Sequence, residues 1–248
     1  RSDYAASPRP VLSSLTMSAP RVILASASPR RRRLIAWLGI DAEMTATDTP
    51  EDLTRPLPPD RLAADIAADK ARAARAAGAR DALALAFDTV VVSDGRVLGK
   101  PADEREARRM LRALSGRGHH VVTGVALLAA GVEIPDTMSV TTRVAMRVLD
   151  DASIETWISR GEALGCAGAY NIEHHLASVS DDECYQNVAG LPLCHLYAEL
   201  ASGRAGSLPP GLTVPIAACD AALHRTCTLG PRVCRAGGGE NEETPAPR

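Results

Sequence analysis

Short apolar runs and amphipathic segments alternate along the chain from residue 21 onward. Residues 21–26 (RVILAS) have the pattern of a buried strand, and residues 28–40 (SPRRRRLIAWLGI) predict a turn that leads into a helix. A polar, proline-interrupted stretch over residues 41–59 is expected to be a loop. Residues 59–78 predict an alanine-rich helix that Asp60 can cap.

The same alternation continues through the second half of the chain. Residues 82–101 predict a hairpin, because two strand-like runs flank the turn signal Asp94-Gly95. The other predicted elements are helices over 103–116, 150–164 and 191–203 and strands over 119–131 and 133–149. The chain is expected to become loop-like from about residue 203. Strands that alternate with helices predict an α/β fold, a mixed twisted sheet with flanking helices.

Composition narrows the classes of partner. The chain has 248 residues, 46% of them apolar, which is enough for one sizeable core. Its formal net charge is −2 and only 3% of its residues are aromatic, so neither a basic surface nor base-stacking platforms favour a nucleic-acid partner. No apolar run reaches the roughly 18–20 residues that span a bilayer. We therefore expect neither nucleic acid nor membrane as a partner.

The two ends of the chain differ in composition from its centre. Residues 1–20 are rich in Ser, Pro and Ala and are expected to be a disordered leader, with Met17 as a candidate start. The ordered domain is expected over residues 21–201, and residues 202–248 form a cysteine-containing extension with a solvated tail. The six cysteines lack paired spacing, which favours free thiols in a reduced, cytoplasmic protein.

The extension contains enough ligand types for a zinc site. The four residues are Cys219, His224, Cys227 and Cys234. Their spacings, Cys-x7-Cys and Cys-x6-Cys, lack the close ligand pair that is usual in structural zinc sites. Structural or free thiols are therefore the favoured interpretation, and zinc remains the alternative.

The segment 23–35 (ILASASPRRRRLI) carries the first candidate chemistry. A strand that runs through a tight turn into a helix presents free backbone N–H groups, and these favour an anion. Ser26 and Ser28 can cap the helix or donate hydroxyl hydrogen bonds, and Pro29 suits the first helical position.

Four successive arginines begin this predicted helix. Arg30 and Arg31 add bidentate donors that suit phosphate oxygens, whereas Arg32 and Arg33 are expected to point toward water. The alternative is a solvated, basic helix start. A targeting signal or nucleic-acid patch is disfavoured, because the run lies between apolar residues that should be buried.

Two lysines and two acids complete the candidate set. The segment 95–101 (GRVLGKP) is one residue short of a Walker motif and has Pro101 in place of Ser or Thr, so Lys100 is expected to act as a single charged phosphate ligand. Asp88 lies within a strand-like run, where a carboxylate is costly unless it is paired, hydrated or metal-bound. The alternative for Asp88 is a salt bridge to an arginine.

The remaining two candidates depend on context. Glu51 lies in the proline-rich loop and by pattern alone could equally be a surface acid; Lys70 would be a solvated lysine. Carboxylates together with triphosphate oxygens form a hard-oxygen site suited to Mg²⁺ or Mn²⁺.

Five segments together resemble the Maf family, and they occur in the family's order. They are LASASPRRRRLI, IAADKA, AFDTVVVSDGRVLGKPADEREARRMLRALSGRGHHVVTG, GCAGAYNIE and NVAGLPLCHL. The resemblance covers about residues 21–201. It implies an ITPase-like α/β fold with two lobes and a central nucleotide cleft. It also implies hydrolysis of a nucleoside triphosphate to the monophosphate and pyrophosphate with a divalent metal, on dTTP and UTP in one clade and on modified or methylated nucleotides in another.

The resemblance also implies a role for each matching residue. Phosphate ligands would be Ser26, Arg30, Arg31, Lys70 and Lys100; metal ligands would be Glu51 and Asp88, with Asp88 also catalytic; base specificity would rest on Arg31, Thr89 and Glu173. The expected cofactor is Mg²⁺ or Mn²⁺. The expected partner is a nucleoside triphosphate, with a homodimer as an open option.

The chain departs from the family pattern at two positions. Phe87 replaces the usual small residue before the acid of the Ala-Asp-Thr motif, and Glu173 replaces the Gln of the dTTP/UTP clade. A Gln amide offers a donor and an acceptor to a pyrimidine edge, whereas an ionised Glu only accepts. These departures leave a non-catalytic nucleotide-binding regulator of cell division as the alternative, although retention of Asp88, Lys70 and Lys100 favours the enzyme.

Overall fold

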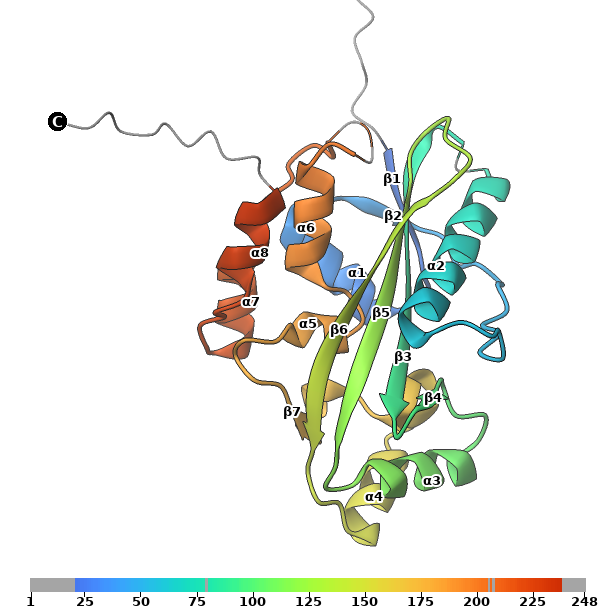
Figure 1. Ribbon diagram of the computed structural model, residues 1–248, viewed down its shortest axis with the longest axis vertical. Helices are drawn as coiled ribbons and strands as arrows, with labels where there is room; N and C mark the ends of the chain where they lie inside the picture. Colours follow the sequence, from blue (N-terminus) through green and yellow to red (C-terminus); the bar gives the residue numbers. More distant parts are fainter. Residues whose placement is uncertain (1–20, 79, 205, 207, 238–248) are drawn as a thin grey trace, which may run out of the picture.

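A mixed sheet runs through the centre of the molecule (Figure 1). The computed structural model describes residues 21–78, 80–204, 206 and 208–237, so the expected leader 1–20 and the tail after 237 lie outside the described residues. Within that part of the chain the sheet has seven strands: six follow the order β2-β1-β3-β5-β6-β7, and the seventh, β4, pairs with β3. The strands are β1 (Arg21–Ala25), β2 (Ala42–Met44), β3 (Ala82–Ser93), β4 (Arg96–Leu98), β5 (Gly118–Leu128), β6 (Asp136–Met146) and β7 (Ala177–Ser178).

The sheet is parallel at one edge and antiparallel through the rest. β1 pairs parallel with both β2 and β3, and β3, β5, β6 and β7 pair antiparallel in turn. The hairpin of β3 and β4 turns at Asp94 and Gly95, both with positive φ, as the sequence predicts. The predicted α/β fold with a mixed sheet and flanking helices is confirmed.

Helices cover both faces and one end of this sheet. In Figure 1, α2 lies on one face, α1, α6, α7 and α8 lie on the other side, and α3 and α4 lie at the lower end. The helices are α1 (Pro29–Ile35), α2 (Pro59–Ala76), α3 (Glu104–Leu114), α4 (Asp151–Ile158), α5 (Tyr185–Val188), α6 (Leu193–Ala201), α7 (Ile216–Leu223) and α8 (Gly230–Gly237). Short 3-10 turns follow α1 at Ala36–Leu38 and link α4 to β7 at Ala163–Gly165, Ala167–Ala169 and Ile172–His174.

The two faces of β3 have different neighbours because successive side chains of a strand alternate. Leu83, Leu85 and Phe87 join the large apolar core, whereas Ala84 and Ala86 face the alanines of α2. Small side chains let α2 approach closely: a Cβ atom added to Gly124 of β5 would lie 2.1 Å from the carbonyl carbon of Ala63. The alanine-rich composition of α2 is therefore a packing requirement as well as a helix-forming one.

Three local expectations are wrong. Residues 42–44 of the expected loop form the edge strand β2, because they pair with β1. Asp60 does not cap α2: the N-cap is Pro58, Pro59 takes the first helical position, and Asp60 lies in the first turn.

The third correction concerns the chain after residue 203, which is helical rather than loop-like. α8 lies beside α6 (Figure 1), and Cys219 of α7 and Cys234 of α8 are buried. Each helix has only eight residues; α7 has little amphipathic periodicity, whereas α8 is clearly amphipathic. α8 packs against α6, and an isolated helix of eight residues is not stable in water.

Candidate active site

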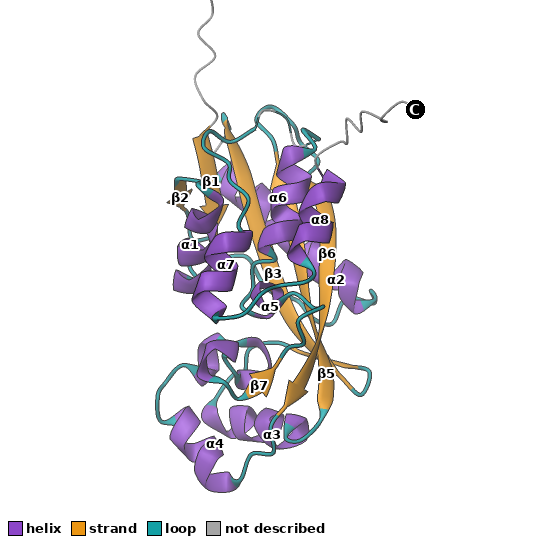
Figure 2. Ribbon diagram, turned by 90° about the vertical axis from the view of Figure 1, so that its left-hand side faces the viewer, coloured by secondary structure: helices purple, strands orange, loops and turns teal. Residues whose placement is uncertain are grey.

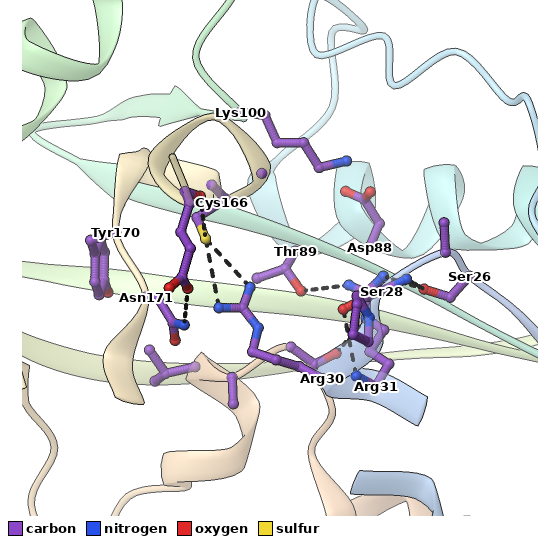
Figure 3. A pocket seen from close by; sticks show the side chains of 18 of the residues that line it. Ser26, Ser28, Arg30, Arg31, Asp88, Thr89, Lys100, Cys166, Tyr170 and Asn171 are labelled. Atoms are coloured by element: carbon purple, nitrogen blue, oxygen red, sulfur yellow. Dashed lines mark hydrogen bonds between the residues drawn. The ribbon is translucent and has the colours of Figure 1, made fainter. Parts of the chain in front are cut away.

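A cavity of about 670 Å³ opens where the turn after β1, the middle of β3 and the segment after α4 meet (Figure 3). Its lining residues come from the upper part of the molecule, with α1 and α2, and from the lower part, with α3 and α4 (Figure 2). All nine site residues expected from the sequence line it: Ser26, Arg30, Arg31, Glu51, Lys70, Asp88, Thr89, Lys100 and Glu173.

The turn between β1 and α1 is held by its two serines. Ser28 is extended and its hydroxyl accepts from the backbone N–H of Arg31 at 3.5 Å, so it caps α1 as predicted. The hydroxyl of Ser26 accepts from the backbone N–H of Ser28 at 3.2 Å and from Nη1 of Arg31 at 3.4 Å. The two serines thus link the turn to Arg31.

Arg31 is the most firmly held of the arginines. Its Nε donates to the carbonyl of Gly190 at 2.9 Å and its Nη2 to Oγ1 of Thr89 at 3.0 Å. Phe87 lies beneath it, with the guanidinium carbon 5.8 Å from the ring centroid. Burial lowers the pKa of Arg31, whereas the nearby charges of Asp88 and Glu51 act in the opposite direction. The unusual Phe87 therefore supports this side chain.

The side chains of the other three arginines, Arg30, Arg32 and Arg33, have different surroundings. Figure 3 shows the guanidinium of Arg30 directed toward Cys166, whose Sγ lies 3.6 Å from both terminal nitrogens. Arg32 is exposed, as expected. Arg33 is also exposed as expected, with 52% of its side chain open to solvent, but it borders the cavity as well and forms an ion pair with Glu173.

Glu51, Lys70, Asp88 and Lys100 form a continuous chain of ion pairs. Nζ of Lys70 lies 2.7 Å from Oε1 of Glu51 and 2.6 Å from Oδ1 of Asp88. Nζ of Lys100 lies 2.7 and 2.9 Å from the two carboxylate oxygens of Glu51. Burial raises the pKa of Glu51, but the charges and hydrogen bonds of both lysines outweigh burial and lower its pKa to about 2.

Two interpretations from pattern alone are thereby corrected. Lys70 is not solvated; only 7% of the residue is exposed, because α2 turns this side chain toward β3. The salt-bridge partner of Asp88 is this lysine and not an arginine. Asp88 follows Ala84 and Ala86 on the face of β3 that meets α2, and this register decides the pairing.

Glu51 and Asp88 are the candidate metal ligands, and their carboxylates share one lysine. Among residues 21–78 and 80–204 and the described part of the extension, no group of three or more His, Cys, Asp or Glu side chains is placed to hold a metal ion. Mg²⁺ commonly binds through one or two carboxylates and takes its other oxygens from substrate phosphates and water. The two carboxylates fit such an ion, which would be shared with the substrate.

Sequence reasoning missed part of the wall at the other end of the cavity. The carboxylate of Glu162 accepts from Nδ2 of Asn171 at 3.1 Å and lies 3.1 Å from Nε2 of His174. Asn171 is close to Glu173 in a segment that the sequence singles out, but no spacing signal marks Glu162. Its place in the wall depends on how the chain folds back after α4.

The structure does not bring Cys219, His224, Cys227 and Cys234 together as a group of metal ligands. All six cysteines are free, and the described residues contain no cluster of metal-ligating side chains. Nε2 of Gln186 lies 3.7 Å from Sγ of Cys219, and the backbone N–H of Gly230 lies 3.3 Å from Sγ of Cys227. Cys219 is buried and Cys227 is partly buried.

Comparison with known proteins agrees with this geometry. The family model described as Maf-like protein matches residues 21–203. The chain belongs to the Maf-like family. Three relatives named dTTP/UTP pyrophosphatase come from Pelotomaculum thermopropionicum, Moorella thermoacetica and Anaeromyxobacter dehalogenans, with identities of 42%, 44% and 44%. The matches cover 71%, 73% and 76% of this chain and 92%, 94% and 95% of those relatives.

A more distant likeness exists to a solved structure from Mycobacterium abscessus, a nucleoside-triphosphatase, dITP/XTP pyrophosphatase. It covers 51% of this chain and 72% of that one at 20% identity, with a TM-score of 0.33. The Maf-like match ends before α7, so α7 and α8 lie beyond the family region. In the part of the chain that the structure describes, no helix is both long and apolar enough to cross a membrane.

Proposed function

We propose that this Maf-like protein is a nucleoside triphosphate pyrophosphatase that acts on dTTP, UTP or a related modified nucleotide. It would hydrolyse the bond between the α- and β-phosphates and release a nucleoside monophosphate and pyrophosphate. The observation that carries the proposal is one cavity that collects the cations Arg31, Lys70 and Lys100 and the acids Glu51 and Asp88. The names of its relatives supply the substrate class.

The roles of the residues follow from their charge and position. Arg30, Arg31 and Lys100, with the hydroxyl of Ser26, would bind the phosphate oxygens and offset the charge that develops on the leaving pyrophosphate. Asp88 would orient a water molecule toward the α-phosphorus and accept its proton. Lys70 holds Asp88 in place at 2.6 Å and adds a further positive charge. Positioning and charge neutralisation would then account for most of the catalysis.

The proposal includes a divalent cation, Mg²⁺ or Mn²⁺, held by Glu51 and Asp88. When bound, such an ion would neutralise phosphate charge and acidify a water molecule. Lys70 and Lys100 already neutralise these carboxylates in the protein alone, so we expect substrate phosphates to draw the lysines away as the ion binds.

The proposal also covers the cellular setting and partners. Six free cysteines favour a reducing compartment, and we place the protein in the cytoplasm on that ground. The net charge of −2 favours a small nucleotide over nucleic acid as the partner. A homodimer is retained as an option that sedimentation of the full chain would test.

The decisive experiment measures pyrophosphate release from a panel of nucleoside triphosphates with Mg²⁺ or Mn²⁺, for the wild type and Asp88→Asn. Turnover of dTTP and UTP by the wild type, reduced at least about 100-fold in the variant, would support the proposal. Turnover restricted to methylated or amino-bearing bases would keep the reaction and change the substrate. Nucleotide binding without any turnover would favour a regulator instead.

A further inference from the structure

The loop that carries Glu51 has no helix or strand of its own to hold it. It runs from the end of β2 at Met44 to the start of α2 at Pro59. One local tie is a turn in which Oδ1 of Asp52 accepts from the backbone N–H of Thr54 at 2.9 Å and from its hydroxyl at 2.6 Å. This turn shapes the loop but does not attach it to the rest of the protein.

Leu53 provides one attachment. Its side chain packs against the small cluster of Ala63, Val90 and Val122 between α2 and the sheet. It also lies over Gly99, where an added Cβ would be 2.5 Å from Cδ1 of Leu53. This contact is apolar and holds the middle of the loop beside the residue that precedes Lys100.

Arg55 provides the second attachment, and it is polar. Its guanidinium forms an ion pair with Asp65 through Nη1 and with Asp69 through Nη2, the latter at 2.7 Å. The two acids lie one turn apart on α2, and Asp69 directly precedes Lys70. The exposed fractions of the side chains are 24% for Arg55, 44% for Asp65 and 32% for Asp69, so the bridge is partly shielded from water.

Segment 51–55 of the loop is therefore tied to α2 at both of its ends. Lys70 holds the carboxylate of Glu51 from inside the cavity, and Arg55 holds the backbone four residues later from outside it. A guanidinium can bridge two carboxylates with a fixed geometry, and it also relieves the repulsion between acids four residues apart on a helix.

We propose that Arg55 is a positioning residue that sets the place of the Glu51 carboxylate between Lys70 and Lys100. The expected loss of activity rests on the proposed function, whereas the expected hold of Arg55 on the loop does not. Arg55 touches neither the cavity wall nor the other candidate site residues, so it acts through the loop.

The test compares Arg55→Ala with Arg72→Ala. Arg72 also pairs with Asp69, at 3.0 Å, but it lies on α2 itself and makes no link to the loop. We expect Arg55→Ala to lower kcat about tenfold or more, as displacement of a site group by a fraction of an ångström can do, with a smaller change in KM. Arg72→Ala should stay within about twofold of the wild type, since an exposed pair contributes little. Arg55→Lys should recover only part of the loss. It keeps the positive charge, but an ammonium cannot bridge both acids as a guanidinium does.

Two further measurements distinguish positioning from general destabilisation. Amide hydrogen exchange of residues 51–55 should speed up in Arg55→Ala while exchange in β3 and β5 stays as in the wild type. In a Glu51→Gln background, Arg55→Ala should add less than about a twofold loss, because a residue that acts through Glu51 has nothing left to position.

Three outcomes would overturn the proposal: unchanged exchange of the loop, an equal loss in Arg72→Ala, or full additivity with Glu51→Gln. If the wild type released no pyrophosphate from any nucleotide, the proposed function would fail, and hydrogen exchange would still decide whether Arg55 holds the loop.

Discussion

Nζ of Lys70 lies 2.6 Å from Oδ1 of Asp88, and the two side chains are only 9% and 4% exposed. The pair joins α2 to the middle of β3 at the floor of the cavity. The attraction between two buried charges does little more than offset the cost of removing both from water. Burying either charge without its partner strongly destabilises the protein. The pair is therefore better explained by its place in the site than by a gain in stability.

Replacing Lys70 by Ala should destabilise the protein strongly. It leaves Asp88 as a buried carboxylate without its partner, and we expect a loss of about 3–5 kcal/mol in the free energy of unfolding. The double variant Lys70→Ala/Asp88→Ala should lose less than the sum of the single variants. Urea unfolding would measure all three. Lys100→Ala is the control, because its side chain is 51% exposed; a loss as large as that of Lys70→Ala would contradict the prediction.

Acid should destabilise the protein partly through Glu51. The pKa of this carboxyl falls from its ordinary value of 4.5 to about 2 in the folded protein, so the unfolded chain binds more protons between those values. Its contribution to stability is thus complete above about pH 4.5 and is lost as the pH falls toward 2. The melting temperature of Glu51→Gln should depend less on pH in this window than that of the wild type. Glu133→Gln, which removes an exposed carboxyl, should follow the wild type.

Gly124→Ala should push α2 away from β5. The added Cβ would meet the backbone of Ala63 at 2.1 Å, and backbone cannot move aside as a flexible side chain can. We expect a loss of about 1–3 kcal/mol or more, measured by thermal unfolding, and a parallel loss of activity because Lys70 moves with the helix. Gly118→Ala on the same strand meets nothing closer than 3.9 Å and should be almost neutral. Similar losses in both variants would show that strand glycines matter here for another reason.

Glu173→Gln should shift activity toward pyrimidines. The carboxylate of Glu173 is paired with Arg33 at the cavity wall, and an amide in its place would add a donor for a carbonyl of uracil or thymine. We expect kcat/KM for UTP to rise about three- to tenfold relative to kcat/KM for a nucleoside triphosphate whose base lacks that carbonyl pattern. Arg33→Ala breaks the same ion pair without adding a donor. An equal shift in both variants would mean that the ion pair alone, and not the amide, decides specificity.

Local sequence signals accounted for most of the secondary structure. Ser28 caps α1, Asp103 caps α3 and Asp150 caps α4, because a short polar side chain satisfies backbone N–H groups wherever a helix begins. Strand β2 and helices α7 and α8 were not predictable in the same way. β2 depends on its pairing with β1 and α8 on its packing against α6, and not only on their own few residues.

The residues that line the cavity could be named from the sequence, since their types and order resemble those of a known family. Their partners could not. A helix pattern makes Lys70 look solvated, and a run of arginines does not reveal that Arg33 pairs with Glu173, because spacing along the chain does not say which acid approaches from elsewhere. Glu162 was missed for the same reason.

The sequence by itself thus determined the α/β class, the Ser28 cap of α1, the hairpin turn and the identity of nine cavity residues. Only the tertiary structure decided that Asp88 pairs with a lysine, that Phe87 supports Arg31, that the loop of Glu51 is tied to α2 by Arg55, and that the extension is helical. Caps and turns depend on neighbours within a few residues. Ion pairs and shared apolar contacts depend on segments that only the folded chain brings together.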